Sequence, residues 1–413
     1  MNFANIFRKY RSLFQTSKPF PQSINFFPEV QARGSIFKLL IFIMIVAALP
    51  ANAQLPNEAF YLRFPVQEAD SGKLTLHTYA LGFSRNNEYF GRFADGYTLF
   101  GYQVMPWLSY QPDKRVRIWA GMFARDDFGN RYYSTISPVF RIQAKFNELQ
   151  FIFGTLQGSL NHQLVEPMYD FERVMLDRLE EGMQLIWERD RFWLDVWIDW
   201  ERTIYTGSPF QEVVSGGFSA RAELLEKNKV KLVLPLQMLA FHQGGQIDTD
   251  PNPLITRVNA AMGLELHKQV DRKFLHSYSL QPYVLRYFDA SNELLVPFDQ
   301  GWGLYLNAAA YTKFGGFMLS YWRGNQYIPI KGGPLFSSYS TTYDNPGATS
   351  AEREVLMLRL LNEIPIGKHL TLSLRGEPFY DLSEKRFDFS HGTYLNYRSS
   401  FELWNRHNKK KIR

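Results

Sequence analysis

Residues 191–203 read RFWLDVWIDWERT, and two kinds of side chain alternate along this stretch. Apolar or aromatic side chains fill the even positions from Phe192 to Trp200. The odd positions hold the set Trp193, Asp195, Trp197, Asp199 and Glu201. Because successive residues of a β-strand face opposite sides, the pattern predicts a strand with one apolar face and one polar face. Such a strand suits a wall between lipid and a wet interior.

The same alternation recurs along the chain, most clearly in residues 97–110 and 229–241. Tyr97, Tyr110, Trp187, Trp200 and Trp404 stand at strand ends, where an aromatic girdle is expected. An even number of strands returns both ends of the barrel to one side of the membrane. We predict sixteen strands: 73–83, 97–110, 115–125, 134–146, 148–157, 181–188, 191–203, 212–224, 229–241, 254–267, 275–288, 300–311, 314–323, 353–363, 369–380 and 391–404.

The connections between these strands alternate between short and long. Short charged links such as 111–114, 188–191 and 226–229 alternate with long ones, of which 158–180 and 324–352 are the longest. Tight turns on one side and long loops on the other are typical of bacterial outer-membrane barrels. The sequence therefore predicts an all-β fold, a transmembrane antiparallel up-and-down β-barrel of about 16 strands (14–18). A soluble β-sandwich or propeller is the alternative, because its strands also alternate.

The N-terminal region predicts export. The apolar run 36–49 follows several basic residues and precedes Ala51-Asn52-Ala53, a signal-peptidase site, so cleavage is expected after Ala53. A retained signal anchor is the alternative. The predicted organisation is an N-terminal extension and signal peptide (1–53), a periplasmic segment (54–72), the barrel (73–404) and a basic periplasmic tail (405–413). The predicted location is the outer membrane.

Composition excludes several classes of protein. The chain has no cysteine, so it has neither disulfides nor a lipid-anchoring cysteine. It holds 46 Lys and Arg against 40 Asp and Glu, but the predicted cleavage would leave 40 against 39. A nearly neutral mature chain gives no indication of a nucleic-acid partner.

These features resemble the porin-like outer-membrane β-barrels of Gram-negative bacteria, over most of residues 73–404. The resemblance implies passive diffusion of small solutes through a lumen narrowed by an inward-folded loop. One feature departs from the family. Such barrels usually end at an aromatic residue, whereas here nine residues follow Trp404.

The strand faces opposite the apolar sets predict which residues line the lumen. They form a basic arc of Arg115, Arg117, Arg141, Arg359, Arg375 and Arg398. Across the barrel we expect the acidic and aromatic set of Trp193, Asp195, Trp197, Asp199 and Glu201. Opposed charges across a narrow pore would create a transverse field. Alternatively, the charges pair with neighbours and satisfy a wet interior.

The long connection 158–180 is a candidate constriction loop, with an extracellular flap as the alternative. Its Leu, Met and Phe side chains favour burial within the barrel. Its acidic candidates are Glu166, Asp170, Glu172 and Asp177. In the lumen, Trp193 and Trp197 alternate with carboxylates, which suits saccharide contact, although aromatic packing of the interior explains the same pattern.

A search for catalytic motifs yields little. An esterase needs a nucleophile with an oriented base, and His162, His242, His267 and His276 lack an accompanying nucleophile motif. Phosphate loops, zinc spacings and dinucleotide fingerprints are absent from the sequence. The sequence therefore predicts no catalytic residues, no metal and no cofactor, and a protein that is not an enzyme.

Two functions are consistent with this sequence. The first is a porin-like channel for passive diffusion of small hydrophilic solutes. The alternative is a non-conducting surface barrel whose extracellular loops bind polysaccharide or a protein partner. The expected partners are outer-membrane lipid and lipopolysaccharide, with small solutes or saccharides as ligands. A homo-oligomer is compatible with the sequence but has no specific signal in it.

Overall fold

The computed structural model describes residues 57–270 and 272–407, most of which lie in strands. The strands are β1 (Lys73–Glu88), β2 (Tyr97–Tyr110), β3 (Val116–Asp127), β4 (Thr135–Phe146), β5 (Leu149–Thr155), β6 (Glu181–Arg189), β7 (Phe192–Arg202), β8 (Glu212–Lys227), β9 (Val230–Gly244), β10 (Ile255–Gly263), β11 (Glu265–Gln269), β12 (Leu275–Asp289), β13 (Gln300–Thr312), β14 (Gly315–Asn325), β15 (Glu352–Pro365), β16 (Leu370–Asp381) and β17 (Arg386–Asn405).

Helices are few and short in the described ranges. They are η3 (Glu58–Phe60), η4 (Glu68–Asp70), η5 (Ser159–His162), α2 (Arg173–Leu176) and η6 (Pro334–Phe336). Within these ranges, no helix has the length and apolar character needed to cross a membrane.

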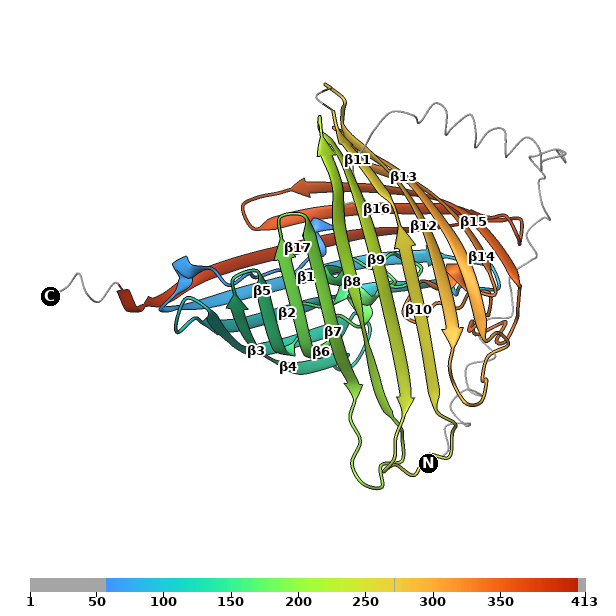
Figure 1. The fold of residues 1–413 in the computed structure, drawn as a ribbon, viewed down its shortest axis with the longest axis horizontal. Coiled ribbons are helices and arrows are strands. Elements are labelled where there is room, and N and C mark those ends of the chain that lie inside the picture. The colour runs from blue at the N-terminus through green and yellow to red at the C-terminus, as the bar shows by residue number, and fades with distance from the viewer. Residues whose placement is uncertain (1–56, 271, 408–413) are drawn as a thin grey trace. The chain divides into compact units, whose positions relative to one another are not determined.

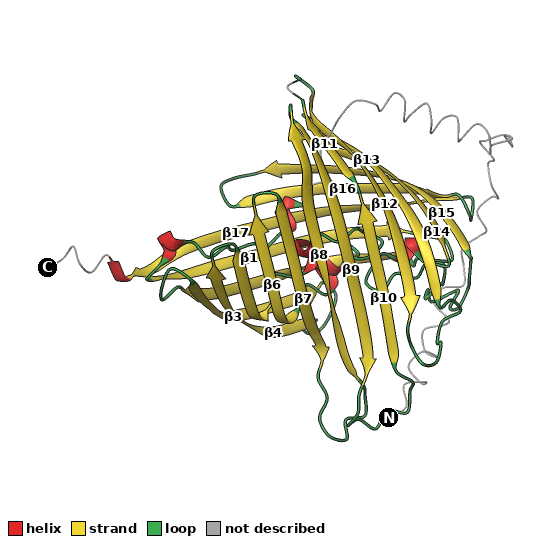
Figure 2. Cartoon of the chain, viewed as in Figure 1, coloured by secondary structure: helices red, strands yellow, loops and turns green. Residues whose placement is uncertain are grey.

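The strands form one closed antiparallel sheet (Figures 1 and 2). Successive strands pair in chain order, and β1 pairs with β17 along its whole length, from Lys73–Asn405 to Glu88–Phe389. Both β10 and β11 pair with β9 and β12, so they are two parts of one strand position interrupted at Leu264. The described sheet is therefore a 16-stranded porin-like barrel, and the predicted fold class is confirmed.

The two faces of the wall follow the alternation in the sequence. In β7, Val196 and Trp200 are exposed on the outside, whereas Asp195, Trp197 and Asp199 are buried inside. One predicted girdle residue is an exception. Tyr97 donates a hydrogen bond to Glu172 of a connection inside the barrel, because its odd position in β2 faces inward.

The short turns have the geometry that a tight hairpin needs. Asn228 and Lys229 connect β8 to β9, and both have positive φ angles, of 53° and 64°. Two consecutive residues of this kind match a type I′ turn, whose twist fits that of paired strands. This geometry explains why a two-residue charged link is sufficient between two long strands.

Three segments fill the barrel interior. We name them the N-terminal segment (57–72), the first connection (156–180) and the second connection (326–351). The first connection buries Leu164, Val165 and Met168 among the inward side chains of the wall. The two connections also bind each other, since the Asp170 amide donates to the Lys331 carbonyl at 2.8 Å.

The N-terminal segment lies against the inward face of the barrel. The Phe60 ring packs edge-on against Phe171 and Tyr394, with centroids 5.1 and 5.2 Å away. Two arginines donate to its carbonyl oxygens: Arg117 of β3 to Pro65 at 3.1 Å, and Arg178 of the first connection to Phe60 at 2.7 Å. The periplasmic assignment of this segment stays a prediction. The predicted signal peptide, and most of the predicted tail, lie outside the described residues.

Close packing inside the wall gives a test of the fold. The Trp322 ring is fully buried against Gly303, where an added Cβ would lie 2.1 Å from a ring carbon. Gly303→Ala should therefore lower the free energy of unfolding by about 1–3 kcal/mol through overpacking. Urea titration in lipid vesicles, followed by tryptophan fluorescence, measures this change. Gly367→Ala is the matched control, since no atom lies within 4 Å of its added Cβ. Equal stabilities of the two variants would contradict the described packing.

Candidate functional site

A cleft opens at the end of the barrel that carries the long connections. Its volume is about 660 Å³, and it lies between residues 86–98 and residues 342–345. The second connection is fastened to the β1–β2 loop beside it: Ser340 Oγ and Thr342 Oγ1 both donate to the Arg92 carbonyl, at 2.5 and 3.0 Å. The Tyr343 amide donates to Asp95 at 3.1 Å. These bonds hold both walls of the cleft in place.

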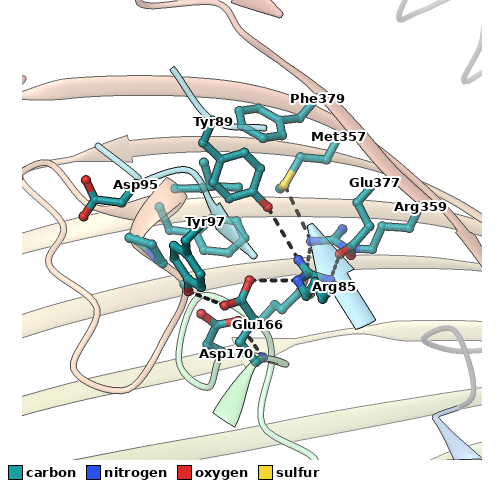
Figure 3. Close-up of a pocket in the computed structure, with 15 residues that line it drawn as sticks. Arg85, Tyr89, Asp95, Tyr97, Glu166, Asp170, Met357, Arg359, Glu377 and Phe379 are labelled. Carbon is teal, nitrogen blue, oxygen red and sulfur yellow. Dashed lines mark hydrogen bonds and ion pairs between the residues drawn. The ribbon is translucent and has the colours of Figure 1, made fainter. Parts of the chain in front are cut away.

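A smaller inner cavity of about 50 Å³ adjoins the cleft (Figure 3). Tyr89, Asp95 and Tyr97 line both spaces. The floor of the inner cavity is charged and includes residues from the first connection. A ligand in the cleft would therefore lie above a preformed polar floor.

Three arginines and three glutamates form a shared ion network at this floor. Arg85 contacts Glu172 at 2.8 Å and Glu377 at 2.7 Å. Arg375 contacts Glu377 at 2.7 Å and Glu166 at 3.2 Å. Arg359 binds the same two glutamates. Since every carboxylate of this network serves at least one buried guanidinium, the network is internally neutralised.

Asp170 stands apart from this network. Its Oδ1 accepts the Glu172 amide at 3.1 Å, and its carboxyl group lines the inner cavity (Figure 3). Burial and the nearby charge of Glu172 raise the pKa of Asp170 to about 7. A carboxyl group that titrates near neutral pH can both accept and donate a proton, which suits general acid–base catalysis.

A second polar cluster joins the first connection to β7. His162 stacks on Trp197 with ring centroids 3.7 Å apart. Its ring nitrogens contact Asp195 and Glu180, both at 2.7 Å. Burial opposes a charge on the ring, but the two carboxylates raise the pKa of His162 to about 9. Because both nitrogens are engaged, His162 is a structural cation and is not available as a base.

Lys331 completes this cluster from the second connection. Its ammonium contacts Asp199 at 3.3 Å and Glu201 at 2.7 Å. Both connections are thus bound to the same wall strand by ion pairs, of which His162–Asp195 and Lys331–Asp199 are buried. The cluster therefore acts as an anchor for the segments that fill the barrel.

The sequence-predicted residues fall into three groups. Arg359, Arg375, Glu166, Asp170 and Glu172 gather at the floor of the cleft. The second group, which faces inward on β7, is Trp193, Asp195, Trp197, Asp199 and Glu201. Its acids pair with His162 and Lys331, and Asp195 and Asp199 also accept hydrogen bonds from β6. The remaining predicted residues lie away from the floor. Arg117 and Arg398 contact the N-terminal segment, and Arg141 contacts the first connection. Arg115 is exposed in a turn, and Asp177 is exposed beside Arg173.

The sequence analysis did not predict two residues of these clusters, Arg85 and Lys331. Arg85 lies in β1, which extends to Glu88, five residues beyond its predicted end. Continuing the alternation from Tyr79 and Leu81 would have placed Arg85 on the inner face. Lys331 had no such signal, because it belongs to an irregular connection. Within the described ranges, no group of three or more metal-ligating side chains is present.

Glu377 is the acid that all three arginines of the network share. We expect Glu377→Gln to lower the free energy of unfolding by about 3–5 kcal/mol, since it leaves buried guanidinium charge uncompensated. Glu148→Gln is the control, because Glu148 is an exposed acid 4.0 Å from Arg189, and exposed pairs contribute about 0–1 kcal/mol. Urea unfolding in vesicles compares the two variants. Similar losses of unfolding free energy in both variants would show that Glu377 stabilises the protein no more than an exposed acid does.

Comparison with solved structures shows barrels of similar architecture. OprD from Pseudomonas aeruginosa is 8% identical, with a TM-score of 0.48, covering 82% of this chain and 98% of that one. OmpT from Vibrio cholerae, in its trimer form, is 8% identical, with a TM-score of 0.49, covering 80% and 100%. OccAB3 from Acinetobacter baumannii is 10% identical, with a TM-score of 0.45, covering 79% and 99%. At such low identity and score, we transfer no function from these barrels. No curated protein matches the chain by sequence.

A protein-family model gives a different kind of match. The model described as "Lipid A 3'-O-deacylase-type" matches residues 66–406, which include every strand. This family is an enzyme family, so the sequence-based prediction that the protein is not an enzyme is wrong. That prediction depended on finding a short nucleophile motif, whereas a family model sums weak preferences along the whole chain. The chain belongs to the lipid A 3'-O-deacylase-type family.

Proposed function

We propose that this protein is an outer-membrane hydrolase that removes an ester-linked acyl chain from a glycolipid of the lipid A class. The family match over residues 66–406 carries this proposal. The cleft supports it, because it is open and polar, and because its lining residue Glu88 pairs with Phe389, which is exposed on the outer wall. The long connections would then face outward, as the sequence predicts, towards the leaflet that holds such glycolipids.

The cleft is suited to a substrate that is part sugar and part acyl chain. Asn86, Asp95 and Asn345 offer hydrogen bonds to hydroxyl and amide groups. Glu88 lines the cleft and is paired in register with Phe389 of β17, whose ring is exposed on the outer wall. An acyl chain could therefore remain along the apolar wall while its ester group enters the cleft.

Asp170 is our candidate for the general base. It lines the cavity beneath the cleft and has no ion-pair partner among the described residues, in contrast to Glu166, Glu172 and Glu377. As a carboxylate it would take a proton from water as that water attacks the ester carbonyl. The resulting hydroxide bonds to the carbonyl carbon, and the alkoxide of the sugar leaves and takes the proton back from Asp170.

Mass spectrometry of lipid A provides the direct test. Purified protein incubated with lipopolysaccharide should release one fatty acid, and Asp170→Asn should lower this rate about 10²–10⁴-fold, as the loss of a general base does. The rate should rise with pH through about 7, because only the ionised form of Asp170 accepts a proton. Asp177→Asn is the control, since Asp177 is an exposed acid of the same connection. Intact lipopolysaccharide would refute the proposed function. Release at an unchanged rate by Asp170→Asn would refute only the role of Asp170.

Passive diffusion of small hydrophilic solutes is the second candidate function. The strand number favours it, because barrels of about 16 strands are wide enough to enclose an aqueous channel. The filled interior opposes it, since cavities between the inner segments and the wall measure about 40–50 Å³.

Planar-bilayer recordings separate the two candidates. We expect no steady conductance from the intact protein, because the two connections pack against the wall through buried ion pairs and the N-terminal segment through hydrogen bonds. Steady ion-conducting events would favour diffusion. Changing Arg115, Arg117 and Arg141 to Glu should then shift the reversal potential towards cation selectivity. A pore whose selectivity stayed unchanged would contradict a role for these arginines.

A further inference from the structure

A cavity of about 40 Å³ lies inside the barrel, away from the cleft. Its walls come from β2, β3, β4 and β5, the N-terminal segment and the first connection. The lining residues that matter for its chemistry are Trp119, Arg141, Ser159, Asn161 and Arg178. Neither the proposed hydrolysis nor the ion network at the floor of the cleft uses this cavity.

Two buried arginines bring positive charge to this cavity without an acidic partner. Arg141 is 3% exposed, and its Nε and Nη2 donate to the carbonyls of Thr155 and Leu156, both at 2.6 Å. Arg178 is 7% exposed and donates to the Phe60 carbonyl at 2.7 Å. None of the residues lining the cavity is Asp or Glu. Carbonyl dipoles and aromatic faces offset part of this charge, but no full negative charge does.

Nearby acids are already engaged by other groups. Asp70 contacts Arg117, the cation on the strand next to Arg141, at 2.7 Å. Glu180 accepts from the Ser159 amide at 3.0 Å and contacts the protonated His162. Burying a guanidinium without a counter-charge is costly, so the two arginines create a strong local preference for an anion.

Unpaired hydrogen-bond donors line the same cavity. Arg141 Nη1, Trp119 Nε1 and Ser159 Oγ have no hydrogen-bond partner in the part of the chain that the structure describes. Arg141 is also held rigid, since its guanidinium lies 4.0 Å from the centre of the Trp119 ring. Asn161 Oδ1, an acceptor, is also unpaired there, but the three donors and two cations outnumber it and favour an anion, which only accepts hydrogen bonds.

The size of the cavity limits the kind of anion. A single water molecule needs about 10–15 Å³ of cavity volume. A cavity of about 40 Å³ therefore has room for one small inorganic anion, but not for a lipid headgroup with its acyl chains. We propose that this cavity is a binding site for one small inorganic anion, of which chloride is the representative. The ion would connect the first connection to the barrel wall through Arg141 and Arg178. This inference does not depend on the proposed enzymatic function.

Bromide provides a direct test, because it substitutes for chloride and scatters X-rays anomalously. Crystals of the full-length protein grown with sodium bromide should show an anomalous peak between Arg141 and Arg178. The proposal would be overturned if crystals grown at saturating bromide showed no anomalous peak and only water in this cavity. This measurement uses the unaltered protein, so it remains decisive even if a variant fails to fold.

Thermal unfolding in detergent gives a second, independent measurement. At equal ionic strength, sodium chloride should raise the unfolding midpoint by a few degrees over sodium gluconate, whose anion is too large for the cavity. Arg141→Met should remove this difference. Arg115→Met should retain it, because Arg115 is exposed in a turn outside the cavity. An equal chloride effect in both variants would mean a general salt effect and would contradict the proposal.

Discussion

The rest of this structure depends on the closure of the sheet by β1 and β17. Inside a bilayer, an unpaired strand edge would expose backbone groups that lipid cannot satisfy, so a spanning sheet must close on itself. Sixteen strands close into a barrel too wide for its own side chains to fill. The chain occupies this space with its N-terminal segment and two long connections. The polar interior of the wall then becomes a surface that binds these segments.

Charge pairing is the means by which the segments are held. Inward arginines that would line an open pore instead bind carbonyls and carboxylates of the connections, as Arg359 and Arg375 do with Glu166. Ion pairs with little access to water need an exact partner, because a lost partner leaves an uncompensated charge. They therefore fix one position for each segment. The floor beneath the cleft is consequently rigid, which suits catalysis more than the passage of solutes.

The sequence was sufficient to predict the wall of this barrel but not its contents. Strand alternation depends only on local order, and all sixteen predicted strand positions are present. Partner choice inside the barrel depends on residues far apart in the chain. Arg85 and Glu377, for example, meet only because β1 and β16 both flank β17. Residues 57–72 show no periodic pattern that would have predicted where the N-terminal segment packs. The enzyme family was missed because its signal is spread along the chain.

The contacts of the N-terminal segment have a consequence for assembly. Arg375 donates to Asn57 at 3.1 Å, and Arg398 donates to the carbonyl of Ala59. These two arginines belong to β16 and β17, the last strands to be synthesised, whereas the segment precedes β1. The first part of the described chain can therefore reach its final position only when the last part has arrived. Contacts of such long sequence separation form slowly. Until then the barrel precursor holds an unfilled interior, so the final hairpin both seals the wall and completes the core.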